Sequence, residues 1–248
     1  MIDRDKFKEK SFFNPYLKTV AFEIRFPSMV RVIDNFSEFQ ENINEIYPNY
    51  AEGFPIMRFP EKIELPETIR SYIFSNENNK TEIRLHLNSI ALLTHTYLGF
   101  NDFKNKVCFV IDNFFSCFKK ISTILRIGLR YTNKIDLSEE IEASVEKIIE
   151  YFQPLFNIDL LHSNKTLTHD IKIKKKISDT ETITYMSKIQ FDNDRNIFYN
   201  KLDFDAYNSN KFTKDQYEEK FMSLHEKEKS EFIDICKDKF LNEMKITE

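Results

Sequence analysis

The basic side chains in the segment Leu125–Leu137 are spaced in a way that could allow them to bind an anion. Successive residues of a β-strand point to opposite faces, so one face would carry Arg126, Gly128 and Arg130 and the other would be apolar. A glycine between two arginines suits a small anion or partner carboxylate held by both guanidinium groups. It equally suits a neighbouring aromatic ring lying over the glycine, or a β-bulge. The two arginine Cα atoms would lie about 13 Å apart, so one small ligand reaches both only if the side chains converge.

A second basic row consists of Lys172, Lys174 and Lys176, which alternate with isoleucines in a predicted strand. Clustered bases favour an anionic ligand or partner, and nucleic acid could bind only through such a local basic face. No aromatic residues interleave with the lysines, so base stacking is not indicated. The alternative role for this row is protection of an edge strand. The predicted anion- or partner-binding residues are therefore Arg126, Arg130, Lys172, Lys174 and Lys176.

Acidic residues give weaker signals for a metal. Asp203 and Asp205 alternate along a predicted strand and could hold Mg²⁺, although a solvated strand face has the same pattern. The run from Asp192 resembles the start of a calcium loop, but Ile197 stands where that loop requires glycine. A polar hairpin turn is the interpretation favoured there.

Catalytic signatures are not found in the sequence. The chain contains no GxSxG, Walker, GxGxxG or HExxH motif, and three glycines are too few for a glycine-rich phosphate loop. A predicted hairpin places Glu82 opposite His95 and His86 opposite Ala91, and two histidines without a third ligand are poor evidence for zinc. The sequence therefore predicts no catalytic residue and no cofactor, and it favours a binding protein over an enzyme.

Composition limits the cellular setting. The chain has 248 residues and a net charge of −4, which gives no global attraction to nucleic acid or to an anionic membrane. Its three cysteines do not form a disulfide framework by count or spacing. The first residues lack the apolar core of a signal peptide, and no stretch approaches the length of a membrane span. These features predict a protein of the reducing cytoplasm.

Hydrophobic periodicity predicts an α+β fold, with helices on one face of antiparallel sheets in two joined halves. The predicted halves are 15–153 and 154–248, after a mobile leader over 1–14 and with a proline-rich irregular connection over 48–69. The predicted strands cover about 18–26, 70–76, 81–87, 90–98, 125–137, 166–177, 181–191 and 196–206. The predicted helices cover about 34–47, 103–121, 138–153 and 214–244.

Five motifs in order resemble a known family. They are Asn14-Pro15 before VAFEIRF, the run Tyr97–Phe100, RIGLRYTNKI at 126–135, LDFDAY at 202–207 and LHEKEKSEFIDICKDKF at 224–240. In this order and spacing the chain resembles a sporadically distributed bacterial and archaeal family of about 250 residues that has no assigned catalytic residues. Where that family usually carries tryptophan near the first aromatic motif, this chain has Phe100.

The resemblance implies a cytoplasmic protein, and patchy distribution is typical of mobile or phage-defence gene neighbourhoods. The leading hypothesis is a non-enzymatic binding or regulatory module, accessory to such a system. The alternatives are a metal-dependent nuclease or phosphohydrolase that uses Asp203 and Asp205, and a self-assembling structural protein.

Overall fold

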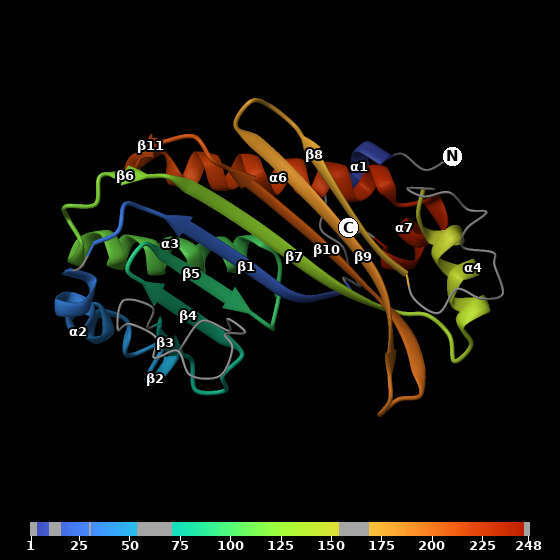
Figure 1. Cartoon of the computed structure of the whole chain (residues 1–248), viewed down its shortest axis with the longest axis horizontal. Coiled ribbons are helices and arrows are strands. Elements are labelled where there is room, and N and C mark those ends of the chain that lie inside the picture. The colour runs from blue at the N-terminus through green and yellow to red at the C-terminus, as the bar shows by residue number, and fades with distance from the viewer. Residues whose placement is uncertain (1–3, 10–15, 30, 54–70, 154–168, 246–248) are drawn as a thin grey trace, which may run out of the picture. The chain divides into compact units, whose positions relative to one another are not determined.

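The computed structural model describes residues 4–9, 16–29, 31–53, 71–153 and 169–245 (Figure 1). They form an α+β fold with one large antiparallel sheet and one small one, which confirms the predicted class. The strands are β1 (Leu17–Arg25), β2 (Asn49–Gly53), β3 (Ser71–Ser75), β4 (Thr81–His86), β5 (Ser89–Thr94), β6 (Thr123–Ile124), β7 (Arg126–Asp136), β8 (His169–Lys176), β9 (Glu181–Asp192), β10 (Ile197–Asn208) and β11 (Phe212–Thr213). The helices are α1 (Arg4–Glu9), α2 (Arg31–Ile43), α3 (Phe100–Cys117), α4 (Ile141–Tyr151), the 3₁₀ turn η2 (Lys214–Gln216), α6 (Tyr217–Ile235) and α7 (Asp238–Met244).

The chain forms two compact units that are not continuous in sequence. Unit 1 consists of 1–18, 130–206 and 222–248, and unit 2 consists of 19–129 and 207–221. The strand order is β7-β10-β9-β8 in unit 1 and β2-β3-β4-β5-β1-β7 in unit 2. The units differ from the predicted halves because the long strand β7 supplies its first four residues to unit 2 and the rest to unit 1. The predicted boundary after residue 153 lies outside the described residues.

Unit 2 buries one face of its strands under two helices. Val20, Phe22 and Ile24 alternate along β1 and are fully buried, as the period-two pattern predicts. The ring of Phe39 on α2 meets Phe74 on β3 edge-on, and Phe114 on α3 also packs against Phe39. Both helices therefore cover the same face of the strands, and the other face carries the polar side chains.

Unit 1 is built in the same way around β7 and β10. The buried side chains of β7 within this unit are Tyr131, Asn133 and Ile135. Phe204 on β10 is buried and meets Phe232 of α6 edge-on, so α6 covers the inner face of these strands (Figure 1). We call the opposite side, which no described helix covers, the open face of unit 1.

Three local expectations differ from the structure. The β4–β5 hairpin turns at Leu87-Asn88, so Glu82 pairs with Leu93 and His86 with Ser89, two residues away from the predicted register. Helix α3 begins at Phe100 after Gly99, whose φ of 112° is a conformation that favours glycine. Residues Asn49–Gly53 form β2 inside the segment predicted to be irregular. The remainder of that segment, 54–69, lies outside the described residues.

The segment predicted to be a mobile leader contains helix α1. Arg4 donates to the carbonyl oxygens of Ile233 and Cys236 at 2.8 and 2.9 Å and to the carboxylate of Asp238 at 3.0 Å. Phe7 is 6% exposed. A short helix is unstable alone, so these contacts with the C-terminal helices position α1 within unit 1.

Candidate functional site

The guanidinium group of Arg126 lies over Gly128 in unit 2. A Cβ atom at Gly128 would come within 3.2 Å of Nη1 of Arg126, so the glycine leaves the space that this side chain occupies. Nη1 donates to Oε2 of Glu23 at 2.7 Å, and the ring of Tyr207 lies 4.5 Å from the guanidinium carbon. The neighbour above Gly128 is thus an arginine from the same strand, stacked on an aromatic ring and bound to a carboxylate.

The other strand arginine, Arg130, belongs to unit 1 and binds a different acid. Its Nη2 donates to Oδ2 of Asp203 at 2.8 Å, while the hydroxyl of Thr132 donates to Oδ1. The side chain of Asp203 is only 4% exposed, whereas that of Arg130 is 44% exposed. Each predicted arginine is therefore held by its own carboxylate, an arrangement that stabilises neighbouring strands.

The acidic pair considered for a metal is part of this arrangement. Both oxygens of Asp203 accept hydrogen bonds from protein donors, and Lys201 lies 3.7 Å from Oδ2. Burial lowers the pKa of the Arg130 guanidinium, but the hydrogen bond and charge of Asp203, with a smaller effect of the Asp205 charge, raise it above its ordinary value. Among the described residues no group of three or more His, Cys, Asp or Glu side chains could hold a metal ion.

We predict that Arg130 and Asp203 are coupled in stability. Arg130→Ala would leave an almost buried carboxylate without its nearest cation, and a buried pair broken in this way costs about 3–5 kcal/mol. Solvent screening of the half-exposed Arg130 reduces the expected cost to about 1–3 kcal/mol. Asp203→Asn alone and the double variant complete a double-mutant cycle, measured by chemical unfolding.

The expected coupling energy in this cycle is above about 0.5 kcal/mol. The matched control is Lys201→Ala, because Lys201 lies farther from Asp203 and has a similar exposed fraction of 43%. Additive effects of Arg130→Ala and Asp203→Asn would contradict the prediction.

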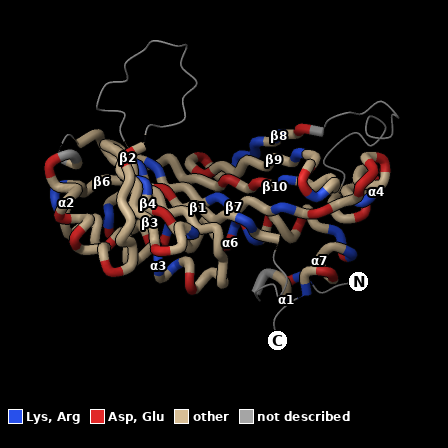
Figure 2. The backbone as a smooth tube through the Cα atoms, turned by 90° about the horizontal axis from the view of Figure 1, so that it is seen from below, with Lys and Arg blue, Asp and Glu red and all other residues tan. Residues whose placement is uncertain are grey.

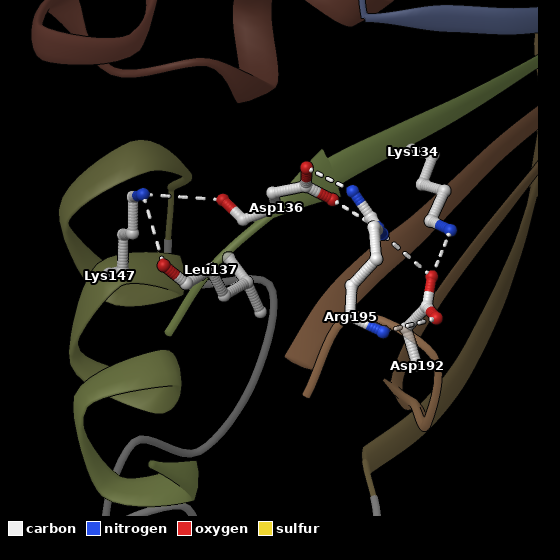
Figure 3. A network of polar contacts seen from close by, with 6 residues as sticks. All are labelled: Lys134, Asp136, Leu137, Lys147, Asp192 and Arg195. Carbon is white, nitrogen blue, oxygen red and sulfur yellow. Dashed lines mark hydrogen bonds and ion pairs between the residues drawn. The ribbon is translucent and has the colours of Figure 1, made fainter. Parts of the chain in front are cut away.

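A network of polar contacts joins the end of β7 to the β9–β10 turn and to α4 (Figure 3). Arg195 donates to both oxygens of Asp136 at 2.7 and 2.9 Å and, through Nε, to Asp192 at 2.9 Å. Lys134 donates to the same Asp192 oxygen at 2.8 Å, and hydrogen bonds from Lys134 and Arg195 lower the pKa of Asp192. Asp192 therefore binds cationic side chains across the hairpin turn, as a polar turn would.

The row Lys172, Lys174 and Lys176 lies on the open face of unit 1, and all three residues are exposed. The β8–β9 register places Lys188 opposite Asp170, which puts Lys188 on the same face, 3.1 Å from that carboxylate. We call these four lysines the lysine face. Figure 2 marks Lys and Arg positions along β8 and β9 in blue.

Exposed aspartates pair with two of the four lysines of the lysine face, Lys176 and Lys188. Lys176 pairs with Asp179 at 2.8 Å, and this aspartate is 98% exposed. No ion pair or side-chain hydrogen bond of Lys172 is found among the described residues. Lys175 points to the opposite side, where it pairs with Glu231 of α6 at 2.6 Å. The lysine face thus presents four ammonium groups whose acidic partners, where an ion pair is found, are themselves exposed.

Sequence reasoning missed a row of polar residues on the inner face of α6, of which Glu228 is fully buried. His225 Nδ1 lies 2.8 Å from the hydroxyl oxygen of Tyr131, Glu228 accepts from the Ala206 amide at 3.0 Å, and Glu231 accepts from the Tyr185 hydroxyl. The helical spacing that places Leu224 and Phe232 inward also places Glu228 inward, so the signal was present in the sequence.

Comparison with protein-family models and with curated protein sequences finds no match for this chain. No described helix is long and apolar enough to cross a membrane. The functional proposal is therefore based on the residues of the open face.

Proposed function

We propose that the protein is a non-enzymatic binding module that captures an anionic partner through the lysine face. The observation that supports this proposal is the row of exposed lysines on the side of unit 1 that no described helix covers. The arginines of β7 are not part of the binding surface proposed here, because their carboxylate partners Glu23 and Asp203 are largely buried, whereas the aspartates that pair with Lys176 and Lys188 are exposed.

The spacing of the lysines fits an extended, repeating anion. Alternate residues of a strand are about 6.6 Å apart, so three ammonium groups line up along β8. Lys188 on β9 adds a fourth positive charge beside the row. A linear anionic partner can meet several of these charges at once, and the attraction would be screened by salt.

The proposal includes a cellular location and a role. We place the protein in the reducing cytoplasm, where free thiols such as Cys108, Cys117 and Cys236 persist. The resemblance based on RIGLRYTNKI adds an accessory role in a defence or mobile-element system. In that role the module binds a partner and leaves catalysis to other proteins.

Charge reversal at the lysine face tests the proposal. The probe is fluorescent poly-glutamate, and its binding is measured by anisotropy at several salt concentrations. The triple variant Lys172→Glu, Lys174→Glu and Lys176→Glu is expected to weaken binding by more than about tenfold, because attraction becomes repulsion. Binding by the unmodified protein is expected to fall as salt rises.

The matched control reverses the same number of charges at exposed lysines of unit 2, namely Lys119, Lys120 and Lys211. This control should bind poly-glutamate nearly as well as the unmodified protein. Equal losses in the two triple variants would show that net charge alone governs binding, and the proposal would fail.

A further inference from the structure

Strand β8 ends the sheet within the part of the chain that the structure describes. In an antiparallel pair, alternate residues direct their backbone N–H and C=O groups to the partner strand and the residues between them direct theirs away. The Ile177 amide donates to the carbonyl oxygen of Glu181 at 2.9 Å. Continuing that alternation along the β8–β9 register, Ile173 and Ile171 also bond to β9. The backbone groups of Lys172, Lys174 and Lys176 therefore point away from β9.

The two sides of β8 present different chemistry to any strand laid along it. The lysines project onto the open face, and Ile171 and Ile173 project onto the other side, where both are half-buried. A neighbouring strand places each of its residues beside a residue of β8, on the same face and with Cβ atoms about 5 Å apart. Such a strand would meet lysine and isoleucine in alternation.

We propose that β8 binds an extended peptide segment in which acidic residues alternate with apolar ones, and that this segment adds to the sheet as an antiparallel strand. The inference rests on the proposed function, since the lysine face supplies the attraction. Main-chain hydrogen bonds to the outward groups of Lys172 and Lys176 supply the alignment, and the isoleucines supply apolar contact. The acidic residues then lie opposite the lysines.

Two other occupants of β8 fit the chemistry less well. A nucleic acid would use the ammonium groups but neither the backbone groups nor the isoleucines. A second copy of β8 in antiparallel pairing would place lysines opposite lysines, which is destabilising. Lysines on an edge strand protect it against such self-association, and the same lysines attract an acidic strand.

The test uses synthetic peptides of about seven residues that alternate glutamate and valine, a length close to that of a typical strand. A peptide of the same composition, with all glutamates at one end, is the matched control. Binding is measured by calorimetry, and the alternating peptide is expected to bind at least about tenfold more tightly, because only it matches both sides of β8.

Backbone pairing is tested without changing the protein. In the proposed antiparallel pairing the glutamate N–H groups point to β8 and the valine N–H groups point away. N-methylation of the glutamates should therefore abolish binding, whereas N-methylation of the valines should leave it nearly unchanged. Equal effects of the two methylation patterns would overturn strand addition.

A pair of variants tests the same contact from the protein side. Lys172→Ala removes the charge and keeps the amide, while Lys172→Pro also removes the outward N–H without breaking a bond to β9. We expect Lys172→Pro to bind the alternating peptide at least about tenfold less tightly than Lys172→Ala. Similar affinities would overturn strand addition, provided that both variants have the same unfolding midpoint.

These outcomes separate the two proposals. If the alternating and control peptides bind equally but poly-glutamate still depends on the lysine face, strand addition is wrong and the proposed function stands. If charge reversal at the lysine face leaves poly-glutamate binding intact, the proposed function itself is wrong.

Discussion

Acidification is expected to destabilise the protein through His225, and His225→Gln should remove much of that sensitivity. Burial, with a smaller effect of the Lys229 charge, lowers the pKa of His225 from its ordinary value of 6.5 to about 3. The ring lies between α6 and β7, where its Nδ1 meets the Tyr131 hydroxyl. The folded protein therefore holds this imidazole neutral.

The direction of the effect follows from proton linkage. Below about pH 6.5 the unfolded chain binds a proton at His225 that the folded chain does not bind. The contribution that the neutral His225 makes to the free energy of unfolding is therefore lost as pH falls from about 6.5 to about 3. Below that range the contribution is lost completely. The gap between the two pKa values corresponds to roughly 3–5 kcal/mol, a large fraction of the stability of a typical domain.

The measurement compares unfolding free energies of the unmodified protein and His225→Gln between about pH 7 and pH 4. At neutral pH the variant should be somewhat less stable, because the glutamine fits the Tyr131 hydroxyl less well. The difference should shrink or reverse on acidification, because glutamine does not titrate. His95→Gln is the control, since His95 is exposed. A difference between His225→Gln and the unmodified protein that stays constant with pH would contradict the expectation.

Local patterns predicted the strands well because alternation is a property of neighbouring residues. The segment predicted as 125–137 is β7, and its apolar side is buried as expected. The predicted lysine row is exposed on one face of β8 for the same reason. The β4–β5 register was missed by two residues, because the chain turns at Leu87-Asn88 and the polar pair Asn88-Ser89 gave the stronger turn signal.

The partners of the arginines could not be predicted from local patterns. Glu23 is 103 residues from Arg126, and Asp203 is 73 residues from Arg130. Which carboxylate meets which guanidinium depends on the order of strands in the sheet, and many orders satisfy the same alternation. The exposure of the β8 lysines could be predicted without knowing the strand order, because it requires only that one face of the strand lack a covering helix.

The buried carboxyl group of Glu228 gives the opposite pH dependence, and Glu228→Gln is expected to stabilise the protein at alkaline pH. Burial raises the pKa of Glu228 well above its ordinary value. The Ala206 amide donates to Oε1 at 3.0 Å and opposes this rise in pKa, whereas the nearby charge of Asp205 adds to it. No partner of Oε2 is found among the described residues. The group is therefore neutral in the folded chain at a pH where the unfolded chain ionises it.

Linkage again sets the sign of the effect. A carboxyl group whose pKa is raised by folding contributes stability that is fully present below about pH 4.5 and is lost as pH rises above that value. Glutamine keeps the oxygen that accepts from the Ala206 amide but cannot ionise. We expect Glu228→Gln to match the unmodified protein within about 1 kcal/mol near pH 4.5 and to exceed it by about 1–3 kcal/mol near pH 8.

The expected stabilisation near pH 8 corresponds to a rise of about 3–10 °C in the unfolding midpoint for a chain of this size. Two further variants make the measurement specific to the buried carboxyl. Glu226→Gln changes an exposed glutamate on the same helix and should leave the pH dependence of stability unchanged. Glu228→Ala removes the acceptor of the Ala206 amide, so a buried N–H group is left unpaired and this variant should be less stable than Glu228→Gln at every pH, by about 1–3 kcal/mol. If Glu228→Gln instead gave no advantage at pH 8, the carboxyl would have to be ionised and satisfied in the folded chain, for example by a buried water that donates to Oε2, which has no partner among the described residues.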